Sequence, residues 1–105
     1  MGTIVRLCRS DDIEIGQARC FSPAGGRPPV ALFNVDGRIY ATADTCSHQR
    51  ASLADGEVDG DEVICPLHFQ VFHIPTGEAR EGVTKEPIAT YPVSISDGEV
   101  MVELP

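Results

Sequence analysis

Two short segments of this chain each combine a cysteine with a histidine. The first reads C-x-H from Cys46 to His48, and the second, after a gap of sixteen residues, reads C-P-x-H from Cys65 to His68. Two thiolates and two imidazoles form a four-ligand set that suits either one tetrahedral zinc ion or a pair of irons. A typical zinc finger supplies two cysteines and then two histidines, so the alternation here favours a dinuclear centre. Two facing loops would then bring both sulfurs to one iron and both imidazoles to the other.

The second segment is expected to lie on a turn between two short strands. Val63 and Ile64 lead into Cys65, and Val71 and Phe72 lead out after Gln70, as residues that suit strands do on either side of a reversal.

Turn signals recur along the rest of the chain and predict antiparallel sheet. The apolar run 30–35 should reverse into 38–41, and the alternating run 93–96 should reverse into 100–104. Helical signals are weak: Asp11, with Glu14 three residues on, predicts one capped turn before Gly16. The turn signals are Asp36-Gly37, Asp55-Gly56, Asp59-Gly60, Pro75-Thr76-Gly77 and Asp97-Gly98.

The length and net charge of the chain limit the number of domains and the kinds of partner that it can bind. A chain of 105 residues fits a single all-β domain over 1–105, with the polar, ligand-bearing stretch of about 44–77 as a subdomain. The formal charge of -8 disfavours nucleic acid and anionic membranes and favours a basic protein face as the partner. The sequence shows no apolar run of membrane-spanning length and no signal-peptide pattern at its start, so we expect a cytoplasmic protein.

The remaining cysteines and the third histidine have ordinary interpretations. Cys8 and Cys20 sit in strand-like runs and are expected to be buried, inert thiols rather than ligands or a disulfide. His73 lies between Phe72 and Ile74, which favours an outward strand residue over a third imidazole ligand.

The ligand segments also carry a family resemblance. C-x-H, the gap near sixteen and C-P-x-H, followed by Phe72 and Thr76-Gly77, resemble the cluster-binding loops of Rieske proteins. The short chain, the expected strand order and the Asp-Gly before the last strand are similar to the Rieske ferredoxins of bacterial ring-hydroxylating dioxygenases. The resemblance implies an antiparallel β-sandwich or barrel with an inserted cluster-binding subdomain.

The same resemblance implies one [2Fe-2S] cluster, with Cys46 and Cys65 on the inner iron and His48 and His68 on the outer iron. It implies a monomeric electron carrier without catalytic activity of its own. Such a carrier takes single electrons from an FAD-containing ferredoxin reductase to a terminal oxygenase in aromatic hydrocarbon catabolism. Two alternatives stay open from the sequence: a Rieske-like small subunit of a larger reductase such as nitrite reductase, and a zinc-binding module.

Departures from the respiratory Rieske proteins predict a low potential. Ala51 and Leu67 stand where those proteins carry an extra disulfide, and Gln70 stands where they carry a serine hydroxyl. With fewer hydrogen-bond donors to the cluster sulfurs, we expect a potential toward the lower end of the range of about -150 to +300 mV. Leu67 and Phe69 are candidates for an apolar docking patch, and Pro87 is a candidate for the proline of a loop that covers the cluster.

Overall fold

The structure is a computed structural model that describes residues 2–23, 25, 27–45, 52–66, 69–82 and 85–105. Three of the predicted ligands, Cys46, His48 and His68, lie outside the described residues, and Cys65 lies within them. The elements in chain order are β1 (Thr3–Arg9), η1 (Ser10–Asp12), β2 (Ala18–Phe21), β3 (Val30–Val35), β4 (Arg38–Ala43), η2 (Leu53–Asp55), β5 (Glu57–Asp59), β6 (Glu62–Ile64), β7 (Val71–His73), β8 (Ala79–Glu81), β9 (Thr90–Tyr91), β10 (Val93–Ser96) and β11 (Glu99–Leu104).

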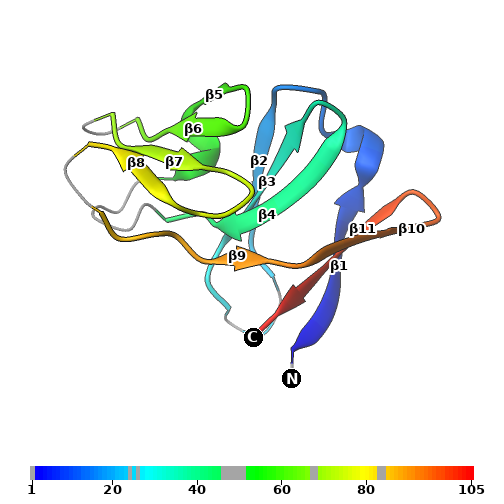
Figure 1. Cartoon of the computed structure of the whole chain (residues 1–105). Coiled ribbons are helices and arrows are strands. Elements are labelled where there is room, and N and C mark those ends of the chain that lie inside the picture. Colours follow the sequence, from blue (N-terminus) through cyan, green and yellow to red (C-terminus); the bar gives the residue numbers. More distant parts are fainter. Residues whose placement is uncertain (1, 24, 26, 46–51, 67–68, 83–84) are drawn as a thin grey trace.

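The strands form three antiparallel sheets, which confirms the predicted all-β class (Figure 1). The first has the order β1-β11-β10, the second β2-β3-β4-β9 and the third β5-β6-β7-β8. Within the described ranges the only helical segments are two short 3-10 turns. None of the helices there is long and apolar enough to cross a bilayer.

Two hairpins form where the Asp-Gly signals predict them. β3 pairs with β4 around Asp36 and Gly37, and β10 pairs with β11 around Asp97 and Gly98. All four turn residues have positive φ, between 51° and 93°. Two-residue hairpins that match the strand twist need this conformation at both central positions, and aspartate and glycine tolerate it best.

Strand β3 is shared between the two hydrophobic cores. Ala31 and Phe33 pack in one cluster with Val63, Cys65 and Phe72 of the third sheet, among others. Val30 and Leu32 pack in the other, with residues of β1, β4 and β11. A strand buried on both faces needs apolar side chains at every position, which explains the unbroken apolar run at the start of β3.

The third sheet is an insertion between β4 and β9. These two strands are neighbours in the second sheet, with Thr42 opposite Thr90, and the Ala43 N–H donates to the Ala89 carbonyl over 2.9 Å. The chain therefore leaves and re-enters the second sheet at adjacent points. The inserted sheet continues to Glu81, beyond the Gly77 boundary expected from the sequence.

The single turn predicted near Asp11 exists but is capped differently. It is the 3-10 turn η1, whose preceding residue, Arg9, donates its backbone N–H to the Asp12 carboxylate over 2.9 Å. The Ser10 N–H donates to the Gly98 carbonyl over 2.8 Å, in the β10–β11 turn. Asp11 as the cap was therefore wrong, because the contact with the β10–β11 turn starts the turn earlier.

Candidate metal centre

The reversal between β6 and β7 carries the described ligand candidate. The last residue pair between β6 and β7 is Ile64 with Val71. Beyond it Cys65 lies opposite Gln70, and the Cys65 N–H donates to the Gln70 carbonyl over 2.7 Å. Cys65 thus lies directly at the end of β6, on the turn between two short strands that the sequence predicts. His68, the other predicted ligand of this motif, follows three residues later in the sequence and is not among the described residues.

The Cys65 side chain faces the interior. Burial alternates along both strands: Val63 and Cys65 are buried on one, and Gln70 and Phe72 on the other, each fully shielded from solvent. Directly opposed residues of an antiparallel pair point to the same face, so the Cys65 sulfur lies over the apolar cluster beneath the sheet. A thiolate in such surroundings needs a positive partner, and a metal ion supplies one.

Phe69, next to the predicted His68, has the opposite environment. Its backbone φ is 54°, which is unusual for a residue other than glycine, asparagine or aspartate, and 75% of its surface is exposed. A large aromatic side chain held outward in a strained turn contributes little to the core. The reversal therefore has a buried sulfur on its inner side and an exposed aromatic ring beside the predicted imidazole ligand.

Asp44 connects residues on the two sides of segment 46–51, the segment that carries two of the other predicted ligands in the sequence. It is 4% exposed, and its carboxylate accepts hydrogen bonds from the Ser52 hydroxyl over 2.9 Å and the Ala54 N–H over 3.0 Å. Thr45 and Ser52 also form an isolated antiparallel bridge. The described residues on either side of the segment are thus held together. We did not predict this role, because Asp44 lies nine residues before η2 and no local capping signal in the sequence marks it.

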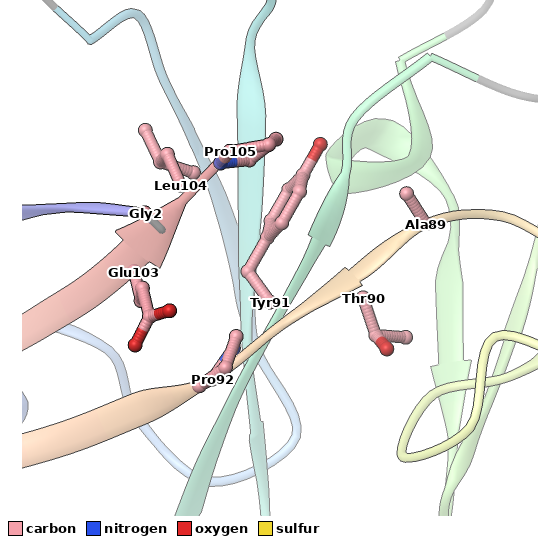
Figure 2. A pocket seen from close by; sticks show the side chains of 8 residues that line it. All are labelled: Gly2, Ala89, Thr90, Tyr91, Pro92, Glu103, Leu104 and Pro105. Carbon is pink, nitrogen blue, oxygen red and sulfur yellow. The ribbon is translucent and has the colours of Figure 1, made fainter.

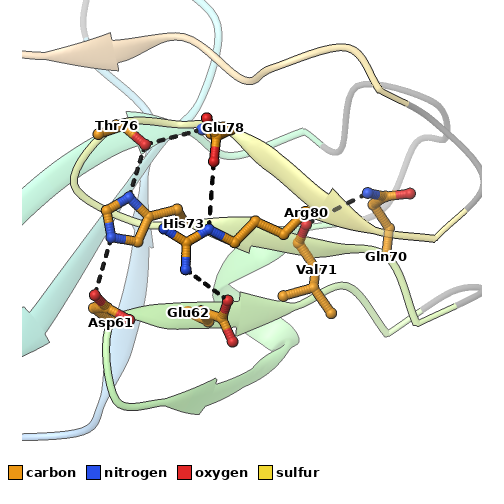
Figure 3. A network of polar contacts seen from close by, with 8 residues as sticks. All are labelled: Asp61, Glu62, Gln70, Val71, His73, Thr76, Glu78 and Arg80. Atoms are coloured by element: carbon orange, nitrogen blue, oxygen red, sulfur yellow. Dashed lines mark hydrogen bonds and ion pairs between the residues drawn. The ribbon is translucent and has the colours of Figure 1, made fainter.

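His73 fastens the far end of the inserted sheet (Figure 3). It lies on β7, as predicted, and its side chain is 14% exposed. One ring nitrogen, Nε2, lies 2.9 Å from an Asp61 carboxylate oxygen, and the other, Nδ1, lies 2.7 Å from the Thr76 hydroxyl. The Glu78 N–H also donates to that hydroxyl, over 3.3 Å. Because both ring nitrogens are engaged, His73 connects the β5–β6 turn to the β7–β8 turn and has no nitrogen left for a metal.

Arg80 crosses the same face of the sheet (Figure 3). Its guanidinium contacts Glu62 over 3.1 Å and Glu78 over 3.4 Å, and the hydrogen bond to Glu62 raises the pKa of Arg80 above its ordinary value. Such exposed pairs add little stability, so they shape the surface of the inserted sheet more than they hold it together.

The two cysteines outside the ligand motifs differ from each other. Cys8 is buried in β1, as predicted, and burial raises the pKa of its thiol. Cys20 is exposed on β2, so the prediction of burial was wrong. The cause is its strand, which lies at the edge of its sheet and pairs only with β3. Partial burial of the sulfur, and next its hydrogen bond with Asp44, raises the pKa of the Cys20 thiol to about 11.

A groove of about 520 Å³ lies between the β9 segment and the C-terminal end of β11 (Figure 2). Tyr91, Pro92, Leu104 and Pro105 give it apolar walls, and Glu103 contributes one carboxylate. Among the described residues that line the groove there is no cysteine or histidine.

Cys65, the one predicted ligand among the described residues, has surroundings that fit an iron–sulfur centre. In the described part of the chain no three His, Cys, Asp or Glu side chains converge as a metal site would require. Cys65 nevertheless provides a buried sulfur at the end of a short hairpin, and Asp44 joins the residues that flank the other predicted ligand segment. A soft thiolate donor sheltered from water suits iron in an iron–sulfur cluster.

Comparison with known proteins decides the family. Residues 3–92 match the model of the Rieske [2Fe-2S] domain. The chain belongs to the Rieske family. The 3-phenylpropionate/cinnamic acid dioxygenase ferredoxin subunit of Escherichia coli strain K12 is 37% identical over 102 residues, which are 96% of this chain and 93% of the relative.

Solved structures agree with this Rieske assignment. The ferredoxin of Sphingomonas yanoikuyae B1 superposes with a TM-score of 0.92 at 37% identity and covers 98% of this chain and 100% of its own. A chain from a complex of reduced oxygenase and oxidized ferredoxin in carbazole 1,9a-dioxygenase superposes with a TM-score of 0.91 at 33% identity, over 98% of this chain and 94% of that one.

These comparisons also show the kind of Rieske protein and its cofactor. The relatives are ferredoxins, electron-transfer subunits rather than the catalytic components of their systems. This chain is a Rieske ferredoxin with one [2Fe-2S] cluster as its cofactor. The zinc-binding alternative is thereby excluded.

Proposed function

We propose that this ferredoxin passes single electrons from an FAD-containing ferredoxin reductase to the terminal oxygenase of an aromatic-ring-hydroxylating dioxygenase system. Support comes from the relatives, since one is named as the ferredoxin subunit of a dioxygenase and another belongs to an oxygenase–ferredoxin complex. The cluster, when bound, supplies a site that takes up and releases one electron. The protein residues must then hold that site and present it to partners.

We assign Cys46 and Cys65 as ligands of the inner iron, and His48 and His68 as ligands of the outer iron. The support for Cys65 is its full burial at the β6–β7 reversal. For the two histidines the support is their place in the family motif, one in each loop. Neutral imidazoles on the outer iron limit the negative charge that reduction leaves on the centre.

One observation carries the proposal: the β6–β7 reversal is buried on one side and open to a partner on the other. Cys65 is shielded completely, whereas Phe69, four residues on, is 75% exposed. An exposed aromatic ring beside a ligand gives a partner an apolar contact close to the electron-carrying site. Phe69, which follows the predicted outer ligand His68 in the sequence, therefore marks the docking face.

Charge favours a basic partner face and a free carrier. The chain has 16 acidic and 8 basic residues, and a net charge of -8 promotes solubility and speeds encounter with cationic surfaces. We place the protein in the cytoplasm as a monomer that binds neither nucleic acid nor membranes. Electron-transfer rates should fall as ionic strength rises, because salt screens this attraction.

The test uses the purified ferredoxin with the FAD-containing reductase and terminal oxygenase of the same organism. Adding NADH and reductase should bleach the visible band of the ferredoxin, and the oxygenase should restore it under air as substrate is hydroxylated. Failure of the oxygenase to reoxidise the ferredoxin, with rapid reoxidation by a nitrite reductase instead, would overturn the proposal in favour of the alternative reductase subunit.

A further inference from the structure

A row of three residues crosses the cluster end of the inserted sheet. Cys65 is opposed to Gln70 through the hydrogen bond from its N–H to the Gln70 carbonyl. On the other side β7 and β8 pair Val71 with Glu81, so the next position outward sets Gln70 against Gly82. Gln70 is thus the middle residue between the inner-iron ligand assigned above and the segment that leaves β8.

The Gln70 side chain is fully buried although it is polar. It shares the inner face of the hairpin with Cys65, since directly opposed residues point to the same side. Its amide nitrogen makes a long contact of 3.4 Å with the Val71 carbonyl (Figure 3). Burying a glutamine carries a desolvation cost, and here the buried side chain lies on the inner face at the ladder position opposite Cys65.

Gly82 leaves room for this side chain. A Cβ at position 82 would lie 2.3 Å from Gln70 Oε1, 2.7 Å from Gln70 Cδ and 2.9 Å from Gln70 Cα. Real Cβ atoms do not approach other heavy atoms so closely, and the Gly82 φ of 126° also disfavours any other residue. The amide of Gln70 therefore lies across the backbone of Gly82, and the two positions are sterically complementary.

We propose that Gln70 is a positioning residue of the cluster site. Its side chain packs against the Gly82 backbone, fills the inner face of the sheet next to Cys65 and keeps water from the cluster. This inference rests on the proposed function, because it takes Cys65 as a ligand. Reduction adds one negative charge, which nearby water would stabilise. Excluding water from this side lowers the potential and slows cluster loss.

The first test is the midpoint potential of Gln70→Ala in the iron-loaded protein, from a redox titration followed by electron paramagnetic resonance. We expect water to enter and the equilibrium constant for reduction to rise about tenfold, which is about 59 mV for a one-electron couple. The control is Asn34→Ala, which removes another buried amide, one that donates to the Ile13 carbonyl over 2.7 Å on β3. It should lower stability and leave the potential unchanged.

The second test is a double-mutant cycle between the two positions, with the rate of iron release on warming as the readout. Gly82→Ala should speed release at least fivefold more in the wild-type background than in the Gln70→Ala background, where only the backbone strain remains.

Two results would overturn the inference while the iron content and reduced spectrum of the wild type stay intact. One is an equilibrium constant for reduction that, in Gln70→Ala, rises less than threefold or falls. The other is an equal effect of Gly82→Ala in both backgrounds. A wild-type protein without iron would instead refute the proposed function itself, so the two failures are distinguishable.

Discussion

Replacing Phe69 by glycine should weaken binding to the terminal oxygenase and leave the free energy of unfolding of the ferredoxin nearly unchanged. The residue is 75% exposed and has a φ of 54°, so its ring packs little and its backbone is strained. Glycine removes a left-handed penalty of about 1 kcal/mol. It adds chain entropy in the unfolded state worth about 0.5–1 kcal/mol. The two effects nearly cancel, so the free energy of unfolding should change by less than about 1 kcal/mol.

The effect on docking is larger. Burying a whole phenylalanine side chain is worth about 1.5–3 kcal/mol. Since 75% of Phe69 is exposed in the free protein, the part available to a partner is worth about 1–2 kcal/mol. At 1.4 kcal/mol for each factor of ten, the KM of the terminal oxygenase for this ferredoxin should rise about five- to thirtyfold.

The assay is the rate of substrate hydroxylation at increasing ferredoxin concentration, with the melting temperature and iron content measured on the same preparation. The control is Ile15→Ala, which removes another exposed apolar side chain, 67% exposed, from the loop between η1 and β2. That loop lies across the molecule from the β6–β7 reversal (Figure 1). An unchanged KM for Phe69→Gly, or an equal rise for the control, would refute the docking face.

Three further predictions concern the residues around the site. Asp44→Ala should lower the free energy of unfolding of the iron-loaded protein by about 1–3 kcal/mol in denaturant titrations, because the Ser52 hydroxyl, the Ala54 N–H and the Cys20 thiol lose their acceptor. The control, Asp59→Ala at an exposed position, should cost less than about 0.5 kcal/mol. Equal costs would contradict the anchoring role of Asp44. His73→Ala should lower the melting temperature but keep the potential and iron content, and loss of iron would make it a ligand. Because the pKa of Cys20 is raised to about 11, its alkylation at pH 8, followed by mass spectrometry, should be about a hundredfold slower than for a thiol of pKa 9.0 and should rise with pH up to about 11. The stability that the neutral thiol contributes is complete below pH 9 and is lost as pH rises through 11. Alkylation at an ordinary rate would contradict the raised pKa that partial burial and the hydrogen bond with Asp44 together produce.

Local signals in the sequence predicted much of the fold. Asp36-Gly37 and Asp97-Gly98 need positive φ at both positions, and few structures other than a tight hairpin require that. The position of Cys65 followed from apolar pairs on each side of the reversal. These predictions succeeded because each depends on neighbours within a few residues.

Features that depend on distant partners were missed or wrong. The exposure of Cys20 follows from β2 being an edge strand, and nothing in the run Ala18–Phe21 shows this. The close packing of Gln70 against Gly82 depends on a steric fit between residues that follow one another only in space. Composition around either position gives no sign of it.

The central claim is that the two Cys-His loops of this chain hold a [2Fe-2S] cluster. The most direct measurement is iron and sulfide analysis of the purified protein, together with its electron paramagnetic resonance spectrum after reduction, for the wild type and for His68→Ala. We predict two irons and two sulfides for each wild-type chain, a signal from one unpaired electron, and loss or marked change of that signal in the variant. A colourless wild-type protein without iron, or a variant with an unchanged signal, would contradict the account.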